Sequence, residues 1–374
     1  MEASSIQLLP DDHGQAILVG RVELDAGPTP VLIRGGLVLD VSGHAATVAD
    51  LLERDDVASL DGPAICGVEA LGTPAGPHLL APIDLQCVKA CGVTFALSAI
   101  ERVIEERARG DADKASTIRG DLEAKVGSGI RSVVPGTPEA ASLKAALIEA
   151  GMWSQYLEVA IGPDAEVFTK APVLSAVGWG AEIGIRSDSD WNNPEPEIVL
   201  VVDRAGTVRG ATLGNDVNLR DFEGRSALLL GKAKDNNAST AIGPFIRLFD
   251  AHFTMDDVRS AVVDLTIDGP EGYTLHGTNK MSEISRDPTD LVRQALSEHQ
   301  YPDGFALFLG TLFAPVQDRD HPGRGFTHKP GDVVRIATPK LGALVNRVTT
   351  SKDAAPWVFG IRDLMRNLSG RGLL

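Results

Sequence analysis

The segment PEPEIVLVV, residues 194–202, constrains the fold of this chain more than any other. Its IVLVV run is rich in β-branched residues, which is typical of a buried strand. Glu195 and Glu197 are separated by one residue, so their side chains leave the same face of an extended chain. Pro194 and Pro196 lack the N–H that a central ladder needs, which favours the start of an edge strand or a bulge. The segment therefore predicts two carboxylates side by side at the rim of a sheet.

A third carboxylate, Asp216, follows the apolar strand GATLG and offers another oxygen ligand at a strand end. Adjacent carboxylates repel each other unless one is protonated or a cation lies between them. No Cys or His is nearby, and oxygen ligands alone favour a hard cation, Mg²⁺ first and Mn²⁺ or Ca²⁺ after it. We expect Glu197 to be exposed, so that it serves the ion and not the core. The alternative is a solvated strand face that binds no ion.

The composition predicts a globular protein of one large or two moderate domains. The chain has 374 residues, 43% of them hydrophobic, and a formal net charge of -16. That charge disfavours nucleic-acid and anionic-membrane partners, because both would repel the protein. An anionic substrate is still allowed, since a bound metal sets the local field. The N-terminal sequence has no signal-peptide pattern and no run approaches the roughly 18 apolar residues of a membrane helix, so we expect a cytoplasmic protein.

Turn signals divide the chain into two expected domains. Short β-rich runs over residues 15–42, followed by a Gly- and Pro-rich piece at 61–78, predict a small N-terminal β domain over residues 1–80. The second domain is expected over residues 81–374. Helical patterns at 94–126 and 137–160 precede the strand FTKAP and predict a helical insertion. The Gly- and charge-rich pieces GDADKAS and GSG indicate that this insertion is a mobile lid.

Five phrases together resemble the fumarylacetoacetate hydrolase family: FTKAP, PEPEIVLVV, GNDVNLRDFEGR, AKDNNASTAIGPF, and GTLFAP followed by KPGDVVRIATPKLGALVNRV. Each phrase is weak alone, but five with sensible spacing are specific. The resemblance runs from about Ala81 to the C-terminus. It implies an α+β fold, a mixed β-sandwich or β-roll with a helical lid. The longer phrases SQYLEVAIGPDAE, NNPEPE and GNDVNLRDFEGRSALLL resemble in particular the family's 2-keto-3-deoxypentonate dehydratase group.

The resemblance also implies roles for individual residues. It implies a Mg²⁺ site with the ligands Glu195, Glu197 and Asp216. Lys234 is implied to project beside the metal. Lys170 falls near the site, with a salt bridge at the rim of the fold as the alternative. Thr311 falls at a contact to a substrate carboxylate, although Thr after Gly in a strand is commonplace.

The lid phrase departs from the family pattern. Smaller members carry a Gly-x-Asn-Tyr…His-x-x-Glu phrase in which His and Glu are taken to activate a hydrolytic water. Here Ser98 and Glu101 stand at those two positions, so the histidine is missing and a hydrolase is disfavoured. We expect Ser98 to contact substrate, and Glu101 to have a raised pKa in an apolar lid and to donate a proton. Both residues also fit a capping box at a helix start.

These residues predict a metal site that stabilises the enolate of a small 2-oxo acid, and the resemblance implies that the reaction is a Mg²⁺-dependent dehydration. A 2-oxo acid chelates Mg²⁺ through its carboxylate and keto oxygen, and the metal stabilises the enolate formed when a C3 proton is lost. Lys234, desolvated near a cation, would have a depressed pKa and act as the base, with Glu101 as the acid for the C4 hydroxyl. The resemblance implies a 2-keto-3-deoxypentonate as substrate, 2-oxoglutarate semialdehyde as product, a place in pentose catabolism, and a homodimer or larger homo-oligomer. The alternatives are a C–C bond hydrolase of an acylpyruvate or fumarylacetoacetate-like diketo acid, and a metal-binding or structural protein with a degenerate site.

Overall fold

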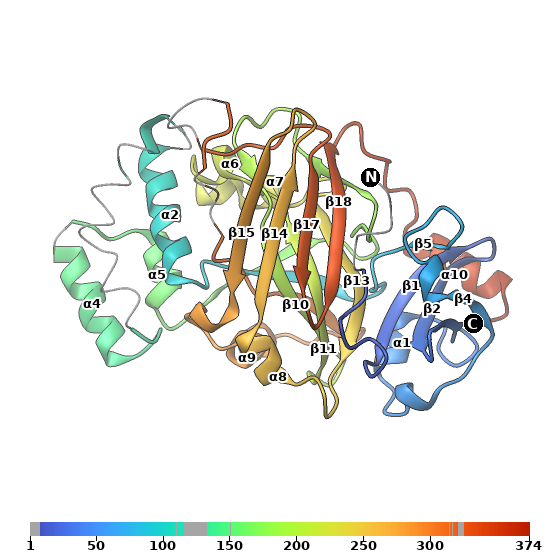
Figure 1. Ribbon diagram of the computed structural model, residues 1–374. Coiled ribbons are helices and arrows are strands. Elements are labelled where there is room, and N and C mark those ends of the chain that lie inside the picture. The colour runs from blue at the N-terminus through green and yellow to red at the C-terminus, as the bar shows by residue number, and fades with distance from the viewer. Residues whose placement is uncertain are drawn as a thin grey trace.

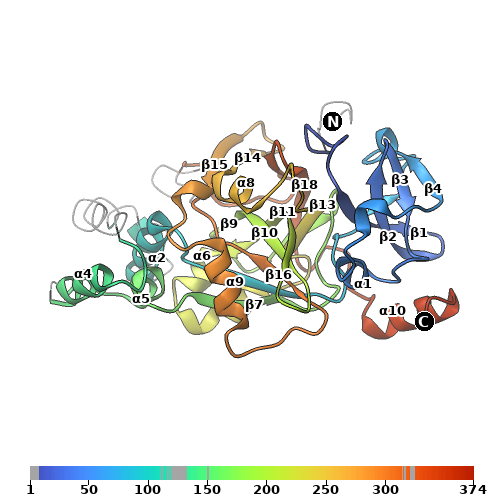
Figure 2. The same cartoon turned by 90° about the horizontal axis from the view of Figure 1, so that it is seen from below.

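Two β-sheets pack face to face at the centre of the protein (Figure 1). The computed structural model describes residues 8–109, 111, 113–115, 118, 133–149, 151–313, 315, 317–320 and 325–374, the side chains of 96 and 97 excepted. Seen from below, the helices α2, α4 and α5 lie at one end of the sandwich and the strands β1–β4 with α10 at the other (Figure 2). The predicted α+β sandwich with added helices is confirmed.

The larger sheet has 11 strands within the described residues. Its strands, in spatial order, are β4 (Ala64–Gly67), β3 (Leu37–Asp40), β2 (Gly27–Arg34), β1 (Leu18–Leu24), β13 (Thr240–Leu248), β11 (Val208–Asp216), β10 (Pro196–Val202), β16 (Phe305–Phe308), β6 (Cys87–Gly92) and β7 (Glu166–Ala171), with β5 (His78–Leu79) beside β1. Most neighbours are antiparallel, but β16 and β6 run parallel, so the sheet is mixed.

The smaller sheet covers one face of the larger one. Its strands, in spatial order, are β15 (Thr274–Lys280), β14 (Val262–Asp268), β17 (Val333–Thr338), β18 (Gly342–Thr350) and β8 (Glu182–Ile185). A two-residue ladder joins β9 (Asn192–Asn193) to β12 (Asn218–Leu219).

The helices lie around the sandwich. They are α1 (Val48–Leu52), α2 (Ala96–Ala108), α4 (Pro138–Glu149), α5 (Gln155–Ile161), α6 (Arg220–Glu223), α7 (Leu230–Lys234), α8 (Met255–Ser260), α9 (Pro288–Leu296) and α10 (Ile361–Gly370). Asp287 caps the N-terminus of α9 by accepting a hydrogen bond from the Thr289 N–H. In the part of the chain that the structure describes, no helix combines the length and apolar character needed to span a membrane.

Strand β10 separates two hydrophobic cores, because its successive side chains point to opposite faces. Ile198 and Leu200 pack into the core shared with the smaller sheet. Val199 and Val201 pack into the core on the other face, which α1 also covers. Every residue of β10 is buried, which explains why the IVLVV run shows no polar alternation.

The edge-strand prediction for PEPEIVLVV is wrong. Strand β10 is central, paired with β11 on one side and β16 on the other. The ladder with β16 begins only at Val199, so Pro196 lies where the strand has a single neighbour and no second partner needs its missing N–H. The carbonyl of Pro196 instead accepts a hydrogen bond from the Asn279 amide at 3.0 Å. The prolines thus mark the start of a central strand.

The N-terminal strands continue the larger sheet through the pairing of β1 with β13. Helix α10 packs against the same strands: the Asn367 amide donates to the Ala26 carbonyl at 2.7 Å and Arg371 donates to the Pro28 carbonyl at 2.9 Å. The division at residue 80 therefore stays a prediction, and any N-terminal unit would also include this C-terminal helix.

The helical insertion is present as α2, α4 and α5 (Figure 1). The second helical pattern divides into two helices near Gly151, whose φ of +65° favours glycine. Three residues of GDADKAS (110, 112 and 116) and all of GSG, on which the prediction of a mobile lid rests, lie outside the described residues.

Candidate active site

The three predicted ligands come together on one face of the β10–β11 ladder. Glu197 lies opposite Gly214 in the antiparallel register, and the Asp216 N–H donates to the Glu195 carbonyl at 3.1 Å, so Glu195 and Asp216 are cross-strand neighbours. Each of the three carboxylates offers one oxygen, and these oxygens lie within 4.8 Å of one another. A Cβ atom at position 214 would collide with the Phe308 ring, so glycine allows this ring to pack closely against the β10–β11 ladder.

The cluster is buried, which corrects the expectation of an exposed Glu197. The exposed fractions are 6% for Glu195 and 2% for both Glu197 and Asp216. The Gly310 N–H donates to Glu197 Oε2 at 2.6 Å, and Gly310 holds a φ of +91° to do so. A backbone N–H from the segment that follows β16 thus fixes one oxygen of Glu197.

Lys234, at the end of α7, projects into the cluster as predicted. Its Nζ donates to Glu195 Oε2 at 2.5 Å and to Asp216 Oδ2 at 3.0 Å. Burial alone would lower the pKa of Lys234, but Asp216, Glu195 and Glu223 together raise it above its usual value. The depressed pKa predicted for Lys234 beside a cation stays a prediction, because here the carboxylates hold the proton on the amine.

Lys170 lies behind the cluster rather than in the cavity. It is completely buried, and its Nζ contacts Asp216 Oδ1 at 2.9 Å and the Lys234 carbonyl at 2.6 Å. Burial would raise the pKa of Asp216, but Lys170 and Lys234 lower it. By contrast, burial and the charges of Asp216 and Glu195 raise the pKa of Glu197. Lys170 thus lies near the site, in a buried ion pair with a carboxylate of the cluster and not in a salt bridge at the rim of the fold.

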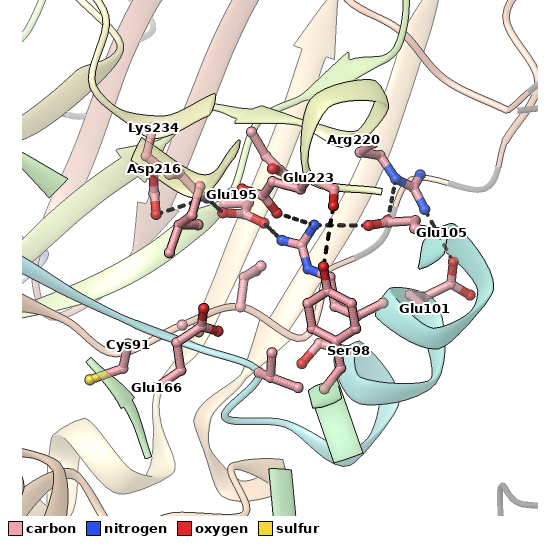
Figure 3. A pocket seen from close by; sticks show the side chains of 18 of the residues that line it. Cys91, Ser98, Glu101, Glu105, Glu166, Glu195, Asp216, Arg220, Glu223 and Lys234 are labelled. Carbon is pink, nitrogen blue, oxygen red and sulfur yellow. Dashed lines mark hydrogen bonds and ion pairs between the residues drawn. The ribbon is translucent and has the colours of Figure 1, made fainter. Parts of the chain in front are cut away.

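One cavity has the carboxylate cluster on one side and helix α2 on the other (Figure 3). Arg102 of α2 reaches across it: its Nη2 contacts Glu195 Oε1 at 2.8 Å, and its Nη1 contacts Glu105 at 2.9 Å and Glu223 at 2.5 Å. Arg220 of α6 donates from Nε to Glu105 at 2.6 Å and stacks on the Trp191 ring at 4.4 Å. Two arginines therefore neutralise the helix side of the cavity.

Ser98 and Glu101 both line this cavity, as predicted, but they do not form a capping box. Helix α2 begins at Ala96 with Phe95 as its N-cap, so Ser98 already lies inside the first turn. Its Oγ donates to the Phe95 carbonyl at 2.8 Å. Glu101 pairs with Arg220 at 3.2 Å, which places its carboxylate beside a permanent positive charge.

Glu166, which the sequence reasoning missed, lines the cavity from β7 (Figure 3). It pairs across the ladder with Gly92, where a Cβ atom would meet Glu166 Oε2 at 2.0 Å, so only glycine leaves room for this carboxyl group. Burial raises the pKa of Glu166, and Arg102 and Lys234 lower it only in part. Among the described residues, none donates a hydrogen bond to its carboxyl group. A half-buried carboxylic acid with a raised pKa and no hydrogen-bond donor among these residues is a candidate proton donor.

Thr311 lines the cavity beyond Gly310 and is 8% exposed. Its Oγ1 accepts a hydrogen bond from the Phe313 N–H at 3.1 Å, which leaves its hydroxyl proton for another acceptor. This position is compatible with the predicted contact to a substrate carboxylate.

Sequence reasoning missed Arg102, Glu105, Glu166, Arg220 and Glu223. Helical spacing of four residues places Glu101 and Glu105 on one face of α2, a signal that was read only as a charged helix. Glu223 lies in the phrase DFEGR, but its role depends on an arginine 121 positions earlier, as the numbering shows. Such long-range pairing leaves no local pattern.

The cluster fits a divalent cation. Two oxygens bound to one ion are at most twice the bond length apart, about 4.2 Å for Mg²⁺ and roughly 4.6 to 5.2 Å for Ca²⁺. The three oxygens lie within 4.8 Å of one another, so they need to move together only slightly to bind one Mg²⁺. The bound ammonium of Lys234 already marks a position where positive charge is favoured.

A family model described as the C-terminal part of fumarylacetoacetate hydrolase matches residues 142–349, which is more than half of the chain and includes the whole carboxylate cluster. The chain belongs to the fumarylacetoacetate hydrolase family. It is 32% identical over 202 residues to a "Probable 2-keto-3-deoxyxylonate dehydratase" of Haloferax volcanii. This matched region covers 54% of this chain and 66% of that protein. It is 31% identical over 186 residues to a "2-dehydro-3-deoxy-D-arabinonate dehydratase" of Saccharolobus solfataricus, which covers 49% of this chain and 58% of that protein. The matched region thus spans less than two thirds of either relative.

Solved structures of fumarylacetoacetate hydrolase family members share the fold. A 2-keto-3-deoxy-D-arabinonate dehydratase in its apo form has a TM-score of 0.65 at 21% identity and covers 89% of this chain and 99% of that chain. A form complexed with magnesium and 2,5-dioxopentanoate has a TM-score of 0.63 at 21% identity with the same coverage. A fumarylacetoacetate hydrolase of Exiguobacterium antarcticum has a TM-score of 0.52 at 15% identity, covering 90% of this chain and all of that one.

Proposed function

We propose that the protein is a Mg²⁺-dependent dehydratase that converts a 2-keto-3-deoxypentonate to 2-oxoglutarate semialdehyde (2,5-dioxopentanoate) and water. The observation that carries the proposal is the convergence of Glu195, Glu197 and Asp216 at the floor of a buried cavity. The names of the two relatives support the substrate class, and so does the solved family member complexed with magnesium and 2,5-dioxopentanoate.

The cluster would hold the ion through these three carboxylates, with Mn²⁺ or Ca²⁺ as possible substitutes. When bound, a divalent ion supplies Lewis-acid polarisation of a keto oxygen, which acidifies the neighbouring C3 position. Thr311, which lines the cavity beside Gly310, is our candidate for binding the substrate carboxylate, and Ser98 is our candidate for a hydroxyl contact from the helix side.

Lys234 is our candidate for the base that removes the C3 proton. Its Nζ is at the floor of the cavity and has two carboxylate partners that hold its proton. Lys234 can accept a proton only where the charge of Glu195 and Asp216 is taken up by a cation other than its own. Lys170 supports this arrangement as a positioning residue, because it orients Asp216 from behind.

Departure of the C4 hydroxyl as water requires a proton donor. Glu101 is the sequence-based candidate, but its carboxylate contacts the guanidinium of Arg220 at 3.2 Å. Glu166 fits the role better, because it lines the cavity, is half-buried and has a raised pKa. We propose Glu166 as the donor. After water has left, a proton moves from C5 to C3 to give the C4=C5 enol. The proton of the C5 hydroxyl then moves to C4 to give the aldehyde, and this balances the reaction.

A C–C bond hydrolase needs a base that activates water. Among the described residues that line the cavity there is no histidine, and Ser98, at the position where smaller members have one, donates to a backbone carbonyl. This disfavours the hydrolase alternative. All the carboxylates and lysines that the family resemblance implies are present at the site. This disfavours the alternative of a metal-binding or structural protein with a degenerate site.

The decisive experiment is incubation of the purified protein and Mg²⁺ with 2-keto-3-deoxy-D-xylonate or 2-keto-3-deoxy-L-arabinonate, with detection of the semialdehyde. We expect product with at least one of them, lost on chelation and restored by added Mg²⁺. Cleavage of an acylpyruvate to pyruvate and an acid, without dehydration of either sugar acid, would instead support the hydrolase.

We further propose a homo-oligomer in the cytoplasm. The described cysteines Cys66, Cys87 and Cys91 are free thiols, which suits a reducing compartment. Exposed apolar side chains lie close together in the C-terminal sequence, namely Trp357, Val358, Ile361 and Met365, and such groups often mark subunit contacts. Sedimentation velocity of the purified protein tests the assembly state, and a monomer at micromolar concentration would contradict it.

A further inference from the structure

We propose that Arg102 is a positioning residue that ties helix α2 to the ion-binding carboxylates, and that its guanidinium competes with the divalent ion for Glu195. This inference rests on the proposed ion site. It concerns a residue of the helix side, outside the ligand set and the proton-transfer groups.

Arg102 connects three parts of the chain that are far apart in sequence. From α2 it contacts Glu195, which precedes β10, and Glu223 at the end of α6, while a third contact goes to Glu105 on its own helix. The side chain is 13% exposed and its partners are between 4% and 8% exposed. A buried guanidinium fork with three carboxylate partners is held in one geometry, so Arg102 fixes the distance between α2 and the cluster.

Both carboxylate oxygens of Glu195 contact a positively charged side chain in this arrangement. Arg102 contacts its Oε1 at 2.8 Å, and Lys234 contacts its Oε2 at 2.5 Å. A divalent ion that uses Glu195 must share an oxygen with one of these cations or displace it. Like charges at such distances repel, and repulsion is stronger in a buried site than in water. Arg102 has two other carboxylates to retain it, so it can leave Glu195 without losing all compensation.

Helix α2 has a second attachment that does not depend on Arg102. Arg220 donates to Glu105 at 2.6 Å and to Glu101 at 3.2 Å. Loss of the Arg102–Glu195 contact therefore loosens one side of α2 but leaves the helix attached to α6. This predicts that an Arg102 variant folds, and that the changes appear in ion affinity and in α2.

The direction in which Mg²⁺ affinity changes when Arg102 is replaced distinguishes this role from a merely structural one. Replacement of Arg102 by the uncharged, similarly long methionine removes a competing cation, so we expect Mg²⁺ to bind more tightly. Turnover should fall, because α2 also loses the contact of Arg102 with Glu223, which the wild type keeps when Mg²⁺ is bound. A residue that only stabilised the fold would, when removed, weaken both.

The test is calorimetric titration of MgCl₂ into the metal-free protein and into the variants Arg102→Met, Arg102→Lys and Arg107→Met. Arg107 is exposed on the same helix and serves as the matched control. We expect Arg102→Met to bind Mg²⁺ at least about fivefold more tightly, which corresponds to about 1 kcal/mol. Arg102→Lys keeps the charge and should bind as the wild type does, but with reduced turnover, because an ammonium cannot make the fork. Arg107→Met should match the wild type in both readouts.

Hydrogen exchange of the unmodified protein gives an independent measurement that no folding defect can disturb. We expect amides of α2 to exchange faster when Mg²⁺ is bound, because Arg102 then releases Glu195. Wild type that binds Mg²⁺ but shows unchanged or slower exchange in α2, or an Arg102→Met variant that folds and binds Mg²⁺ equally or more weakly, would overturn the inference and leave the ion site intact. Wild type that binds no Mg²⁺ would overturn the proposed ion site itself.

Discussion

The two walls of the cavity place their charged groups by different means. On the strand wall, Glu195, Glu197 and Asp216 are positioned by the register of β10 and β11, which backbone hydrogen bonds fix. On the helix wall, Glu105 and Glu223 are positioned by the arginines that they contact. The strand wall is therefore preformed, whereas the helix wall depends on charges that an ion or a substrate can rearrange.

The largest expected effect is on the strand wall, from Glu197→Gln. This change keeps an acceptor for the Gly310 N–H but removes a ligand charge, so we expect turnover to fall by at least about a thousandfold and Mg²⁺ binding to be lost. Burial and like charges oppose ionisation of Glu197, so the thermal midpoint of the metal-free protein should not fall. Calorimetry, turnover and melting curves test this, with the exposed Glu182→Gln as control. A variant with wild-type turnover would refute the assignment of Glu197 as a ligand. It would also show that the strand wall has no special role in binding the ion.

Proton transfer is expected from β7 rather than from the helix wall. Glu166→Gln should lower turnover by about 10² to 10⁴, the range typical of a lost general acid, while Glu101→Gln should lower it less than tenfold. Because the raised pKa of Glu166 keeps its proton to higher pH, wild-type turnover should fall as pH rises through that pKa, and Glu166→Gln should lose this dependence. Rate measurements against pH for both variants decide the matter. The reverse ranking would return the acid role to Glu101 and move the chemistry to the helix wall.

A smaller effect, on stability, is expected from Lys170→Met. The change leaves Asp216 buried with one cation fewer, so we expect a loss of about 3 to 5 kcal/mol in the free energy of unfolding. Mg²⁺ should restore part of this loss, because a bound ion takes up the charge of Asp216. Denaturant titration with and without Mg²⁺ measures both. Lys329→Met, in a half-exposed ion pair, is the control and should cost less than about 1 kcal/mol. Equal losses from the two lysines would show that the strand wall is not preorganised by Lys170.

The strand wall was predictable because its pattern is local. Spacing of one residue put Glu195 and Glu197 on one face, and a strand end put Asp216 beside them. The family resemblance supplied Lys234, which no spacing rule would have found. The pKa of Lys234 could not be predicted, since its direction depends on three carboxylates from separate segments.

The wrong predictions had a common cause, which is pairing with residues distant in sequence. Pro196 indicated an edge strand, but the second neighbour, β16, comes more than 100 positions later and begins its ladder past the proline. Ser98 and Glu101 matched a capping box, but the bridge from Phe95 to Ile284 precedes the helix start and fixes it earlier. Sequence patterns predicted the elements, whereas tertiary contacts set their exact boundaries and charges.

The alternation of side chains along β10 has a consequence for how the length of this chain can vary. Insertion or deletion of a single residue between Glu197 and Val199 would turn both glutamates toward the space between the two sheets, where only apolar side chains fit. Neither a natural nor an engineered insertion or deletion of one residue is therefore compatible with the ion site in that short stretch.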